Sequence, residues 1–312
     1  MKDKRVVFMG TPEYSVPVLK MLIENTTVVG VVTQPDKEVG RKRILTACPV
    51  KKVALANGIF VLSPERIRDD YQSIIDLNPD IIITCAYGQI IPEELIYAPE
   101  YNTINVHASL LPKYRGGAPI QRAIMNGEDE IGVTIMYTDK NMDSGDIIEA
   151  ESFALDINDT YDTISKKMSI LGADLLKRVL PSIFNRTNKR KEQDKSMITY
   201  APVIKRDDEH IDFNDNAINI HNKIRSLSSI PGAYAVLDDQ NIKIYLSSLE
   251  DCNDTDSSPG TITRVNKDSI FVACKDKEIR ILEIQMPGKK RVLVKDYLNG
   301  TKKELLLNKT LK

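Results

Sequence analysis

The sequence predicts an α/β protein of two domains: a larger one built on a doubly wound, mostly parallel sheet, and a small β-barrel that follows it. Three observations predict this class. Apolar runs alternate with helical patterns over residues 1–184, the segment 185–205 is polar and aperiodic, and short β-like runs separated by turns fill residues 206–312. Strand–helix alternation is typical of parallel sheets, and closely spaced short strands are typical of barrels.

The predicted strands of the larger domain are continuously apolar, as strands covered on both faces should be. They are RVVFMG (5–10), TVVGVVT (27–33), IFVLS (59–63), DIIITCAYG (80–88), TINVHAS (103–109) and GVTIMYT (132–138). The more polar stretch DIIEAESFALD (146–156) is predicted to be a further strand. Pro17 favours the start of a helix over 17–25, and Pro119 with Gly127 frames a second helix. The stretch 160–184 predicts a long helix, because its apolar positions recur at steps of three and four.

The predicted strands of the smaller domain are short and separated by turns. They are AYAVLD (233–238), IKIYLSS (242–248), GTITRVN (260–266), SIFVACKD (269–276), EIRILEIQ (278–285) and VLVKDYL (292–298). This pattern suits a small barrel, for which the oligonucleotide-binding (OB) type is one candidate. We therefore expect domains at 1–184 and 206–312, joined by a linker at 185–205.

Composition and simple motifs exclude several classes of protein. The formal net charge of the 312 residues is −1, and no run approaches the about 18 apolar residues of a membrane span. The four cysteines lie far apart, no H-x-x-x-H spacing occurs, and both G-x-G-x-x-G and the P-loop motif are missing. A strand pattern begins almost at once and leaves no room for a presequence. We expect a cytoplasmic monomer with no membrane partner and no metal.

An Asn and a His stand where one predicted strand ends, in TINVHASLLP (103–112). Alternate residues of a strand share a face, so Asn105 and His107 point the same way. In open α/β sheets the carboxyl ends of the strands face the ligand crevice. An Asn amide and a neutral imidazole can donate hydrogen bonds to one oxygen, which stabilises an oxyanion while the imidazole moves a proton. The alternative is a pair that only caps the sheet edge.

A carboxylate that could work with this His lies in NMDSGDII (141–148). Asp143 would accept a hydrogen bond from His107, orient the ring and hold a water for proton transfer. The alternative is a turn carboxylate, because Asp commonly bonds nearby backbone amides.

The stretches beside this pair suit a flat heterocycle with polar edges. SLLP offers backbone amides and carbonyls next to apolar side chains, and the run 80–92 supplies a second apolar wall. Core packing is the alternative for each apolar member, and Gly116 and Gly117 would let backbone approach a ligand closely. The candidates are Ser109, Leu110, Leu111, Pro112, Tyr87, Ile90 and Ile91.

Two basic clusters remain. The stretch 36–46 is predicted to be a loop with Arg41, Lys42 and Arg43, and the C-terminal tail carries Lys289, Lys290 and Arg291. Such clusters are ordinarily solvated surface. Their alternative is phosphate binding, which positions a nucleic acid without reading its sequence.

Together these stretches resemble the methionyl-tRNA formyltransferase family nearly from end to end. The similar stretches are VVFMGTPEYSVPVL, TQPDKEVGRKR, ACPVK, NVHASLLPKYRGGAPIQRAI, MDSGDII, IHNKIRSLSSIPGAYA and GKKRVLVKDYLNG. The resemblance implies a Rossmann-like formyltransferase domain and an OB barrel that holds the tRNA stem. It also implies transfer of a formyl group from 10-formyltetrahydrofolate to the α-amino group of methionyl initiator tRNA, for translation initiation.

The same resemblance implies roles for individual residues. Asn105 and His107 would bind the formyl oxygen and stabilise the oxyanion, while Asp143 would hold His107 and relay the proton that the amine loses. Residues 109–112 match the folate-binding SLLP of the family. The loop with Arg41 matches the loop that reaches the tRNA acceptor end.

Two departures and two alternatives stand beside this interpretation. Ile230 occupies a position where Trp is frequent, and Val203 occupies one where Lys is expected, which removes a basic contact. The N-x-H, SLLP and D-x-G-D motifs are shared with other formyltetrahydrofolate-using enzymes, so a transferase or hydrolase with a small-molecule acceptor stays open. A non-catalytic RNA-binding protein stays open too. The basic loop and the second domain favour tRNA as the substrate.

Overall fold

The computed structural model describes residues 1–40, 42–300 and 303–312, which form two compact units. Unit 1 comprises Met1–Pro119, Ile131–Phe153 and Ser165–Pro202, and unit 2 comprises Ile120–Glu130, Ala154–Ile164 and Val203–Lys312. The chain therefore passes into unit 2 twice before it completes that unit, which the sequence does not indicate. The predicted division into 1–184, 185–205 and 206–312 stays a proposal.

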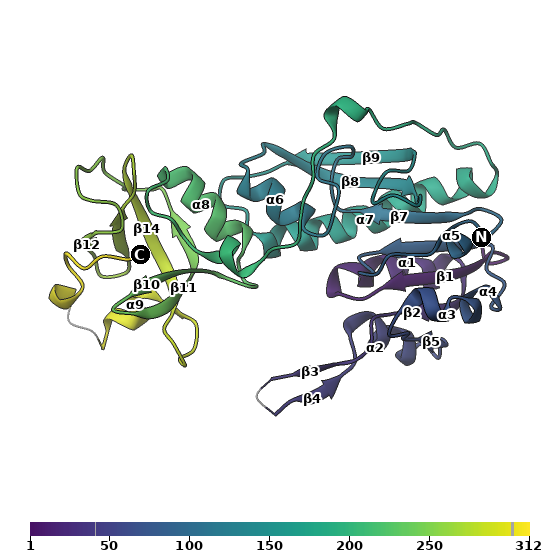
Figure 1. The fold of residues 1–312 in the computed structure, drawn as a ribbon, viewed down its shortest axis with the longest axis horizontal. Coiled ribbons are helices and arrows are strands. Elements are labelled where there is room, and N and C mark those ends of the chain that lie inside the picture. The colour runs from purple at the N-terminus through teal and green to yellow at the C-terminus, as the bar shows by residue number, and fades with distance from the viewer. Residues whose placement is uncertain (41, 301–302) are drawn as a thin grey trace. The chain divides into compact units, whose positions relative to one another are not determined.

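A seven-stranded sheet forms the centre of unit 1 (Figure 1), in the order β5-β2-β1-β6-β7-β8-β9. The first five of these strands run parallel, and β8 runs antiparallel to β7, so the mostly parallel, doubly wound sheet is confirmed. The strand order reverses between β1 and β6, where open α/β sheets bind their ligands. The strands are β1 (Arg5–Gly10), β2 (Thr27–Val32), β5 (Val61–Leu62), β6 (Ile81–Cys85), β7 (Thr103–His107), β8 (Glu130–Tyr137) and β9 (Ile147–Ala154).

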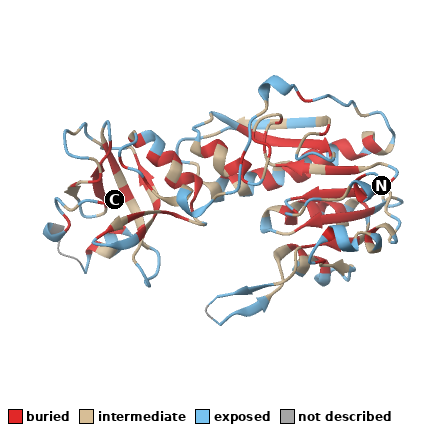
Figure 2. Cartoon of the chain, in the orientation of Figure 1, coloured by how far each residue is buried: buried red, intermediate tan, exposed pale blue. Residues whose placement is uncertain are grey.

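The continuous apolar runs predicted for the central strands are buried on both faces in the structure, whereas the edge strands β5 and β9 are partly exposed. Ile81, Ile82 and Ile83 of β6 are all fully buried, so neither face of the strand meets solvent, and the red bands of Figure 2 follow the central strands. Prolines lie at the starts of three helices: Pro17 is in the first turn of α1, Pro49 begins α2, and Pro119 begins α6. The helices outside the C-terminal segment are α1 (Val16–Asn25), α2 (Pro49–Ala56), α3 (Ile67–Asp70), α4 (Gln72–Ile75), α5 (Glu93–Ile96), α6 (Pro119–Met125) and α7 (Tyr161–Phe184).

The basic stretch 36–46 is a β-hairpin, not the loop that we predicted. Strands β3 (Lys37–Val39) and β4 (Ile44–Thr46) pair antiparallel, and the Gly40 carbonyl accepts a hydrogen bond from the Arg43 amide at 3.1 Å. Gly40 has φ +73°, which glycine adopts readily, and it opens the turn. The hairpin projects away from the sheet of unit 1 in Figure 1.

The predicted domain of short strands is confirmed in unit 2, which is built on an antiparallel sheet in the order β10-β11-β14-β13-β12 with β15 beside β14. The last residues of the chain close this sheet into a ring. Val236 and Lys312 exchange two backbone hydrogen bonds, and Leu311 donates to the Gly260 carbonyl next to β12. The elements are α8 (Ala217–Ser226), β10 (Ala233–Leu237), β11 (Gln240–Ser248), β12 (Ile262–Val265), β13 (Ile270–Ala273), β14 (Glu278–Gln285), β15 (Val292–Leu293) and α9 (Val294–Leu298).

The predicted strand 292–298 is wrong over most of its length. Only β15 is extended, and the remaining residues form α9. A strand would place Val294, Asp296 and Leu298 on one face, burying the carboxylate with its apolar neighbours. The helix instead brings Val294 and Leu298 together as a buried i, i+4 pair and leaves Asp296 exposed.

Candidate active site

The site begins where β6 and β7 end. The two strands are parallel, and their register places Thr84 directly beside Asn105. Two residues further along the same face of β7 is His107, which is 6% exposed. The carboxyl end of β7 thus carries a polar pair on a strand that is otherwise mostly buried.

Asn105 is oriented by its neighbour on β6. The Thr84 hydroxyl donates a hydrogen bond to Asn105 Oδ1 at 2.9 Å. With the carbonyl end of the amide engaged in this way, Nδ2 keeps its two N–H donors for another partner. Asn105 is therefore set as a hydrogen-bond donor.

His107 lies between two oxygen atoms of the surrounding loops. Its Nε2 is 3.1 Å from the Tyr114 carbonyl oxygen, and its Nδ1 is 3.6 Å from Asp143 Oδ1. A neutral ring can donate to one of these oxygens, while a protonated ring can donate to both. The arrangement gives His107 a backbone anchor and a carboxylate neighbour, which are the contacts that a proton-transferring imidazole needs.

Asp143 is held on the side away from the ring. Its Oδ2 accepts the Gly116 amide at 2.8 Å, and its backbone has φ +49°. Gly116 is required at this contact, because a Cβ there would lie 2.6 Å from the Ala201 carbonyl oxygen and its φ is +126°. The carboxylate therefore bridges the 114–117 loop and His107.

A second carboxylate shapes the turn that leads to Asp143. Asp139 Oδ1 accepts the Tyr97 hydroxyl at 2.7 Å and the Lys140 amide at 2.8 Å. These hydrogen bonds, the one from Tyr97 first, lower the pKa of the Asp139 carboxyl. Asp139 stays ionised and serves as an anchor for the turn.

The SLLP loop is fixed by a neighbouring strand. The Thr134 hydroxyl on β8 donates to the Ser109 carbonyl at 2.6 Å and accepts the Leu111 amide at 3.1 Å. Ser109 and Leu111 are buried, so of the four loop residues Leu110 and Pro112 are the partly exposed apolar ones.

The predicted second apolar wall, like the SLLP loop, has both buried and accessible side chains. Tyr87 is 4% exposed and packs in a core cluster with Val7, Met9 and Val32. Burial raises the pKa of its phenol to about 12. Ile90, by contrast, is 83% exposed, and Ile91 is partly buried. The side chains available to a flat ligand are thus Ile90 and Ile91.

The basic residues lie in two places that the structure describes separately. Lys42 and Arg43 are exposed on the β3–β4 hairpin, and Arg43 pairs with Glu38 at 3.3 Å, while Arg41 lies outside the described residues. In unit 2, Lys289 and Lys290 are exposed in the turn after β14. Arg291 bonds Glu283 at 2.5 Å and stacks 4.3 Å from the Tyr245 ring centroid, so a carboxylate already balances its charge.

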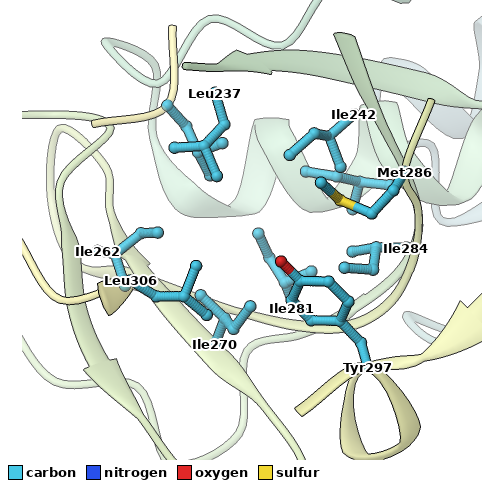
Figure 3. Close-up of a pocket in the computed structure, with 11 residues that line it drawn as sticks. Leu237, Ile242, Ile262, Ile270, Ile281, Ile284, Met286, Tyr297 and Leu306 are labelled. Atoms are coloured by element: carbon cyan, nitrogen blue, oxygen red, sulfur yellow. The ribbon is translucent and has the colours of Figure 1, made fainter. Parts of the chain in front are cut away.

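Unit 2 also contains a cavity, but its lining is apolar and offers no groups for catalysis. The close-up in Figure 3 shows it lined by aliphatic side chains such as Ile242, Ile281 and Ile284, with Met286 and Tyr297 at one side. Most of its lining belongs to the core cluster of the barrel. Without converging polar groups among the described lining residues, it is part of the barrel interior.

Over residues 1–40, 42–300 and 303–312, no group of three or more His, Cys, Asp or Glu side chains is placed to hold a metal ion. Within the same ranges, no helix is long and apolar enough to cross a membrane.

Sequence reasoning missed several groups around the site. The Tyr114 carbonyl and the Gly116 amide are backbone atoms, which no residue pattern marks. Thr84 could have been identified from the sequence, because it is a polar residue inside the apolar run IIITC. Gln193, which donates a hydrogen bond to the Asp143 carbonyl, lies in the segment predicted as a linker, and no sequence pattern marks it.

Comparison with known proteins gives matches along almost the whole chain. A family model described as formyl transferase matches residues 4–180, and one described as formyl transferase, C-terminal domain, matches residues 203–302. A methionyl-tRNA formyltransferase of Staphylococcus aureus (strain MW2) is 46% identical over 310 residues, which is 98% of this chain and 99% of that protein.

Solved structures with low sequence identity share the fold. An N-formyltransferase from Helicobacter canadensis, solved with folinic acid and dTDP-3-aminofucose, has a TM-score of 0.65 at 21% identity, covering 91% of this chain and 99% of that one. A methionyl-tRNA formyltransferase from Clostridium thermocellum has a TM-score of 0.56 at 18% identity, covering 79% and 94%.

Proposed function

Because the chain belongs to the formyl transferase family, and within it to the methionyl-tRNA formyltransferases, we propose that it transfers a formyl group from 10-formyltetrahydrofolate to the α-amino group of methionyl initiator tRNA. The product is formylmethionyl-tRNA for translation initiation. The observation that carries this proposal is the meeting of Asn105, His107 and Asp143 at the carboxyl end of β7, in a chain 46% identical to a relative of that name.

The donor binds beside SLLP. Leu110, Pro112, Ile90 and Ile91 supply apolar surface for the planar pterin ring, while backbone groups of residues 109–112 meet its polar edge. The buried side chains of Ser109, Leu111 and Tyr87 support this wall from behind. This arrangement leaves the formyl group at Asn105 and His107.

The reaction proceeds by attack of the amine nitrogen on the formyl carbon. As the new C–N bond forms, the carbonyl π electrons move to the oxygen, and Asn105 Nδ2 stabilises the resulting oxyanion. His107 adds a second hydrogen bond when its Nε2–H turns from the Tyr114 carbonyl to this oxygen. The amine's proton passes through water to Asp143. Collapse restores the carbonyl, breaks the bond from carbon to N10 of the folate, and returns a proton to that nitrogen.

The acceptor is held by basic residues away from the reacting atoms. Arg41, Lys42 and Arg43 contact the acceptor end of the tRNA, and Lys289, Lys290 and Arg291 contact its stem. The enzyme works as a monomer in the cytoplasm, where initiator tRNA is charged and used.

The test is formylation of methionyl initiator tRNA by the purified protein with 10-formyltetrahydrofolate, with an amino sugar nucleotide as the competing acceptor. We expect formylmethionyl-tRNA from the wild-type protein and no turnover of the sugar nucleotide. Asn105→Ala should lower the single-turnover rate by about 10²–10³, the usual effect of removing an oxyanion donor. Consumption of the donor with only the sugar nucleotide, or with water, would contradict the proposal, and an unchanged Asn105→Ala rate would contradict the mechanism.

A further inference from the structure

Gln193 is a buried amide that connects two loops of the candidate active site. Its side chain is 8% exposed and comes from the polar segment that follows α7. Nε2 donates to the Asp143 carbonyl and to the Gly145 carbonyl, each at 2.8 Å. Oε1 accepts the Arg115 guanidinium twice, from Nε at 3.1 Å and from Nη2 at 2.7 Å.

These four contacts determine which way the amide faces. Arg115 can only donate, so the oxygen of the amide must point to it, and the NH₂ group must point to the two carbonyls. Arg115 is itself 8% exposed, so its charge depends on this neighbour for hydrogen bonds that water would otherwise supply. Gln193 and Arg115 therefore form a fixed pair.

The turn on the other side of the amide is the one that carries Asp143. Asp143 has φ +49°, a conformation that costs free energy for a residue with a side chain. A Cβ on Gly145 would lie 1.9 Å from the Tyr137 carbonyl oxygen, so the turn is pressed against β8. Hydrogen bonds from one side chain to both Asp143 and Gly145 hold this turn closed.

The two ends of the amide meet the two loops that form the carboxylate's surroundings. Arg115 directly precedes Gly116, whose amide binds Asp143 Oδ2, and directly follows Tyr114, whose carbonyl binds His107. The backbone of Arg115 also pairs with Thr199 and Ala201, further along the segment of Gln193. The Gln193–Arg115 pair therefore fixes both the Gly116 amide that binds Asp143 and the Tyr114 carbonyl that binds His107.

We propose that Gln193 is a positioning residue, which through Arg115 and the Asp143 turn sets the distance between the Asp143 carboxylate and His107. The role rests on the proposed function, in which Asp143 takes up the amine's proton. A loosened turn would move the carboxylate from His107 and slow proton transfer while leaving the binding surfaces for folate and tRNA intact.

The variant Gln193→Glu tests whether Gln193 positions the Asp143 turn or only stabilises the fold. The carboxylate keeps both hydrogen bonds from Arg115, now as an ion pair, but it presents an oxygen to two carbonyls and repels the turn. We expect kcat to fall by about 10–100-fold, because displacing a reacting group by about 1 Å can cost about 10²-fold in rate, with KM for both substrates within about threefold. Gln193→Ala, which loses both ends, should be at least as slow.

The matched control is Asn222→Asp. Asn222 is a buried amide in unit 2 whose Oδ1 accepts Arg225 Nε at 2.9 Å, so the same chemical change is made beside a buried arginine. Its kcat should stay within about twofold. A second readout is the ring NMR signals of His107, assigned with His107→Gln among the three histidines of the chain. They should shift in Gln193→Glu and not in Asn222→Asp.

The outcomes separate this proposal from the proposed function. If wild-type protein makes no formylmethionyl-tRNA, the proposed function fails, while the His107 signals still decide whether Gln193 holds Asp143 in place. A Gln193→Glu variant with wild-type kcat, or with unmoved His107 signals, overturns the proposal. A loss of activity that follows a lower melting temperature equally in both variants overturns it as well.

Discussion

At the scale of one residue, the orientation of the Asn105 amide is determined by a single neighbouring side chain. Its amide could present either an acceptor or a donor to a substrate, and the Thr84 hydroxyl decides between them by engaging Oδ1 at 2.9 Å. Thr84 is 5% exposed, so little competing solvent reaches this hydrogen bond. The donor that the proposed oxyanion needs is thus prepared before any substrate binds.

Thr84→Val should expose this dependence. Valine keeps the shape of threonine but leaves Asn105 Oδ1 without its donor, so the amide can turn over. A hydrogen bond of about 1 kcal/mol biases the orientation by about fivefold, so losing it lowers the productive fraction from roughly five-sixths to roughly one half. We therefore expect kcat to fall by about twofold with KM unchanged. Steady-state kinetics of Thr84→Val and Thr84→Ser provide the measurement. Thr84→Ser should recover the wild-type kcat, and two equally slow variants would refute the role of the hydroxyl.

The sequence predicts the side chains of the site better than their surroundings. Asn105, His107 and Asp143 follow from strand periodicity, the position of a strand end and a turn motif, all of which are local. Gln193 is 50 residues from the Asp143 carbonyl that it binds. A long-range hydrogen bond of this kind, like that of the Gly116 amide to Asp143, depends on how the loops fold together, which no local pattern encodes.

At the scale of an element, α8 places polar residues on its buried face. His221 Nε2 donates to the Ile157 carbonyl at 2.9 Å, and Arg225 Nη1 donates to the Asp156 and Asp159 carbonyls at 2.9 Å each. A buried polar group is tolerated when it is hydrogen-bonded, so each contact ties the helix to the segment 154–164 of unit 2. The helix therefore holds that segment by specific bonds as well as by apolar packing.

This arrangement gives the stability of unit 2 a dependence on acid. Burial lowers the pKa of His221 from 6.5, with Arg225 adding to the effect and the Ile157 carbonyl opposing it. At a pH between the two pKa values, His221 is therefore protonated in the unfolded chain and neutral in the folded chain. The stabilising contribution is complete above about pH 6.5 and is lost as the pH falls toward the lower pKa of the folded state, at up to about 1.4 kcal/mol per pH unit.

Urea titrations between pH 7.5 and 5 compare the wild-type protein with His221→Gln, whose side chain does not titrate. The free energy of unfolding should fall more steeply with acid in the wild type, although the variant starts lower. Parallel pH dependences in the two proteins would show that His221 is not responsible.

Elements also show where patterns mislead. The apolar run 292–298 fits a strand by composition, but only the helix α9 leaves Asp296 in solvent. The hairpin β3–β4 lacks a buried face: Val39, Ile44 and Leu45 are 57–67% exposed, so the burial signal that marks the sheet strands is weak there. Long buried strands and the long helix α7 were predictable because their apolar positions repeat over many residues.

At the scale of the whole molecule, charge must be considered locally. A formal net charge of −1 gives no general attraction to a polyanion. Groups of exposed cations lie on the hairpin of unit 1, with Lys42 and Arg43, and in the turn of unit 2, with Lys289 and Lys290. A further group, Lys189, Arg190 and Lys191, lies in the segment after α7. In the proposed function, affinity for tRNA depends on a small number of phosphate contacts and on the counterions that they release.

The double substitution Lys42→Ala with Arg43→Ala tests this view. Each lost phosphate contact should reduce the slope of log(kcat/KM) against log[salt] by about one, and Arg43, which already pairs with Glu38, should contribute the smaller part. We expect lower kcat/KM for methionyl-tRNA at low salt, curves that converge at high salt, and unchanged affinity for the folate donor. The matched control, Lys20→Ala with Lys177→Ala, removes two exposed charges from α1 and α7. Equal slopes in both double variants would mean that tRNA responds to total charge and not to the hairpin.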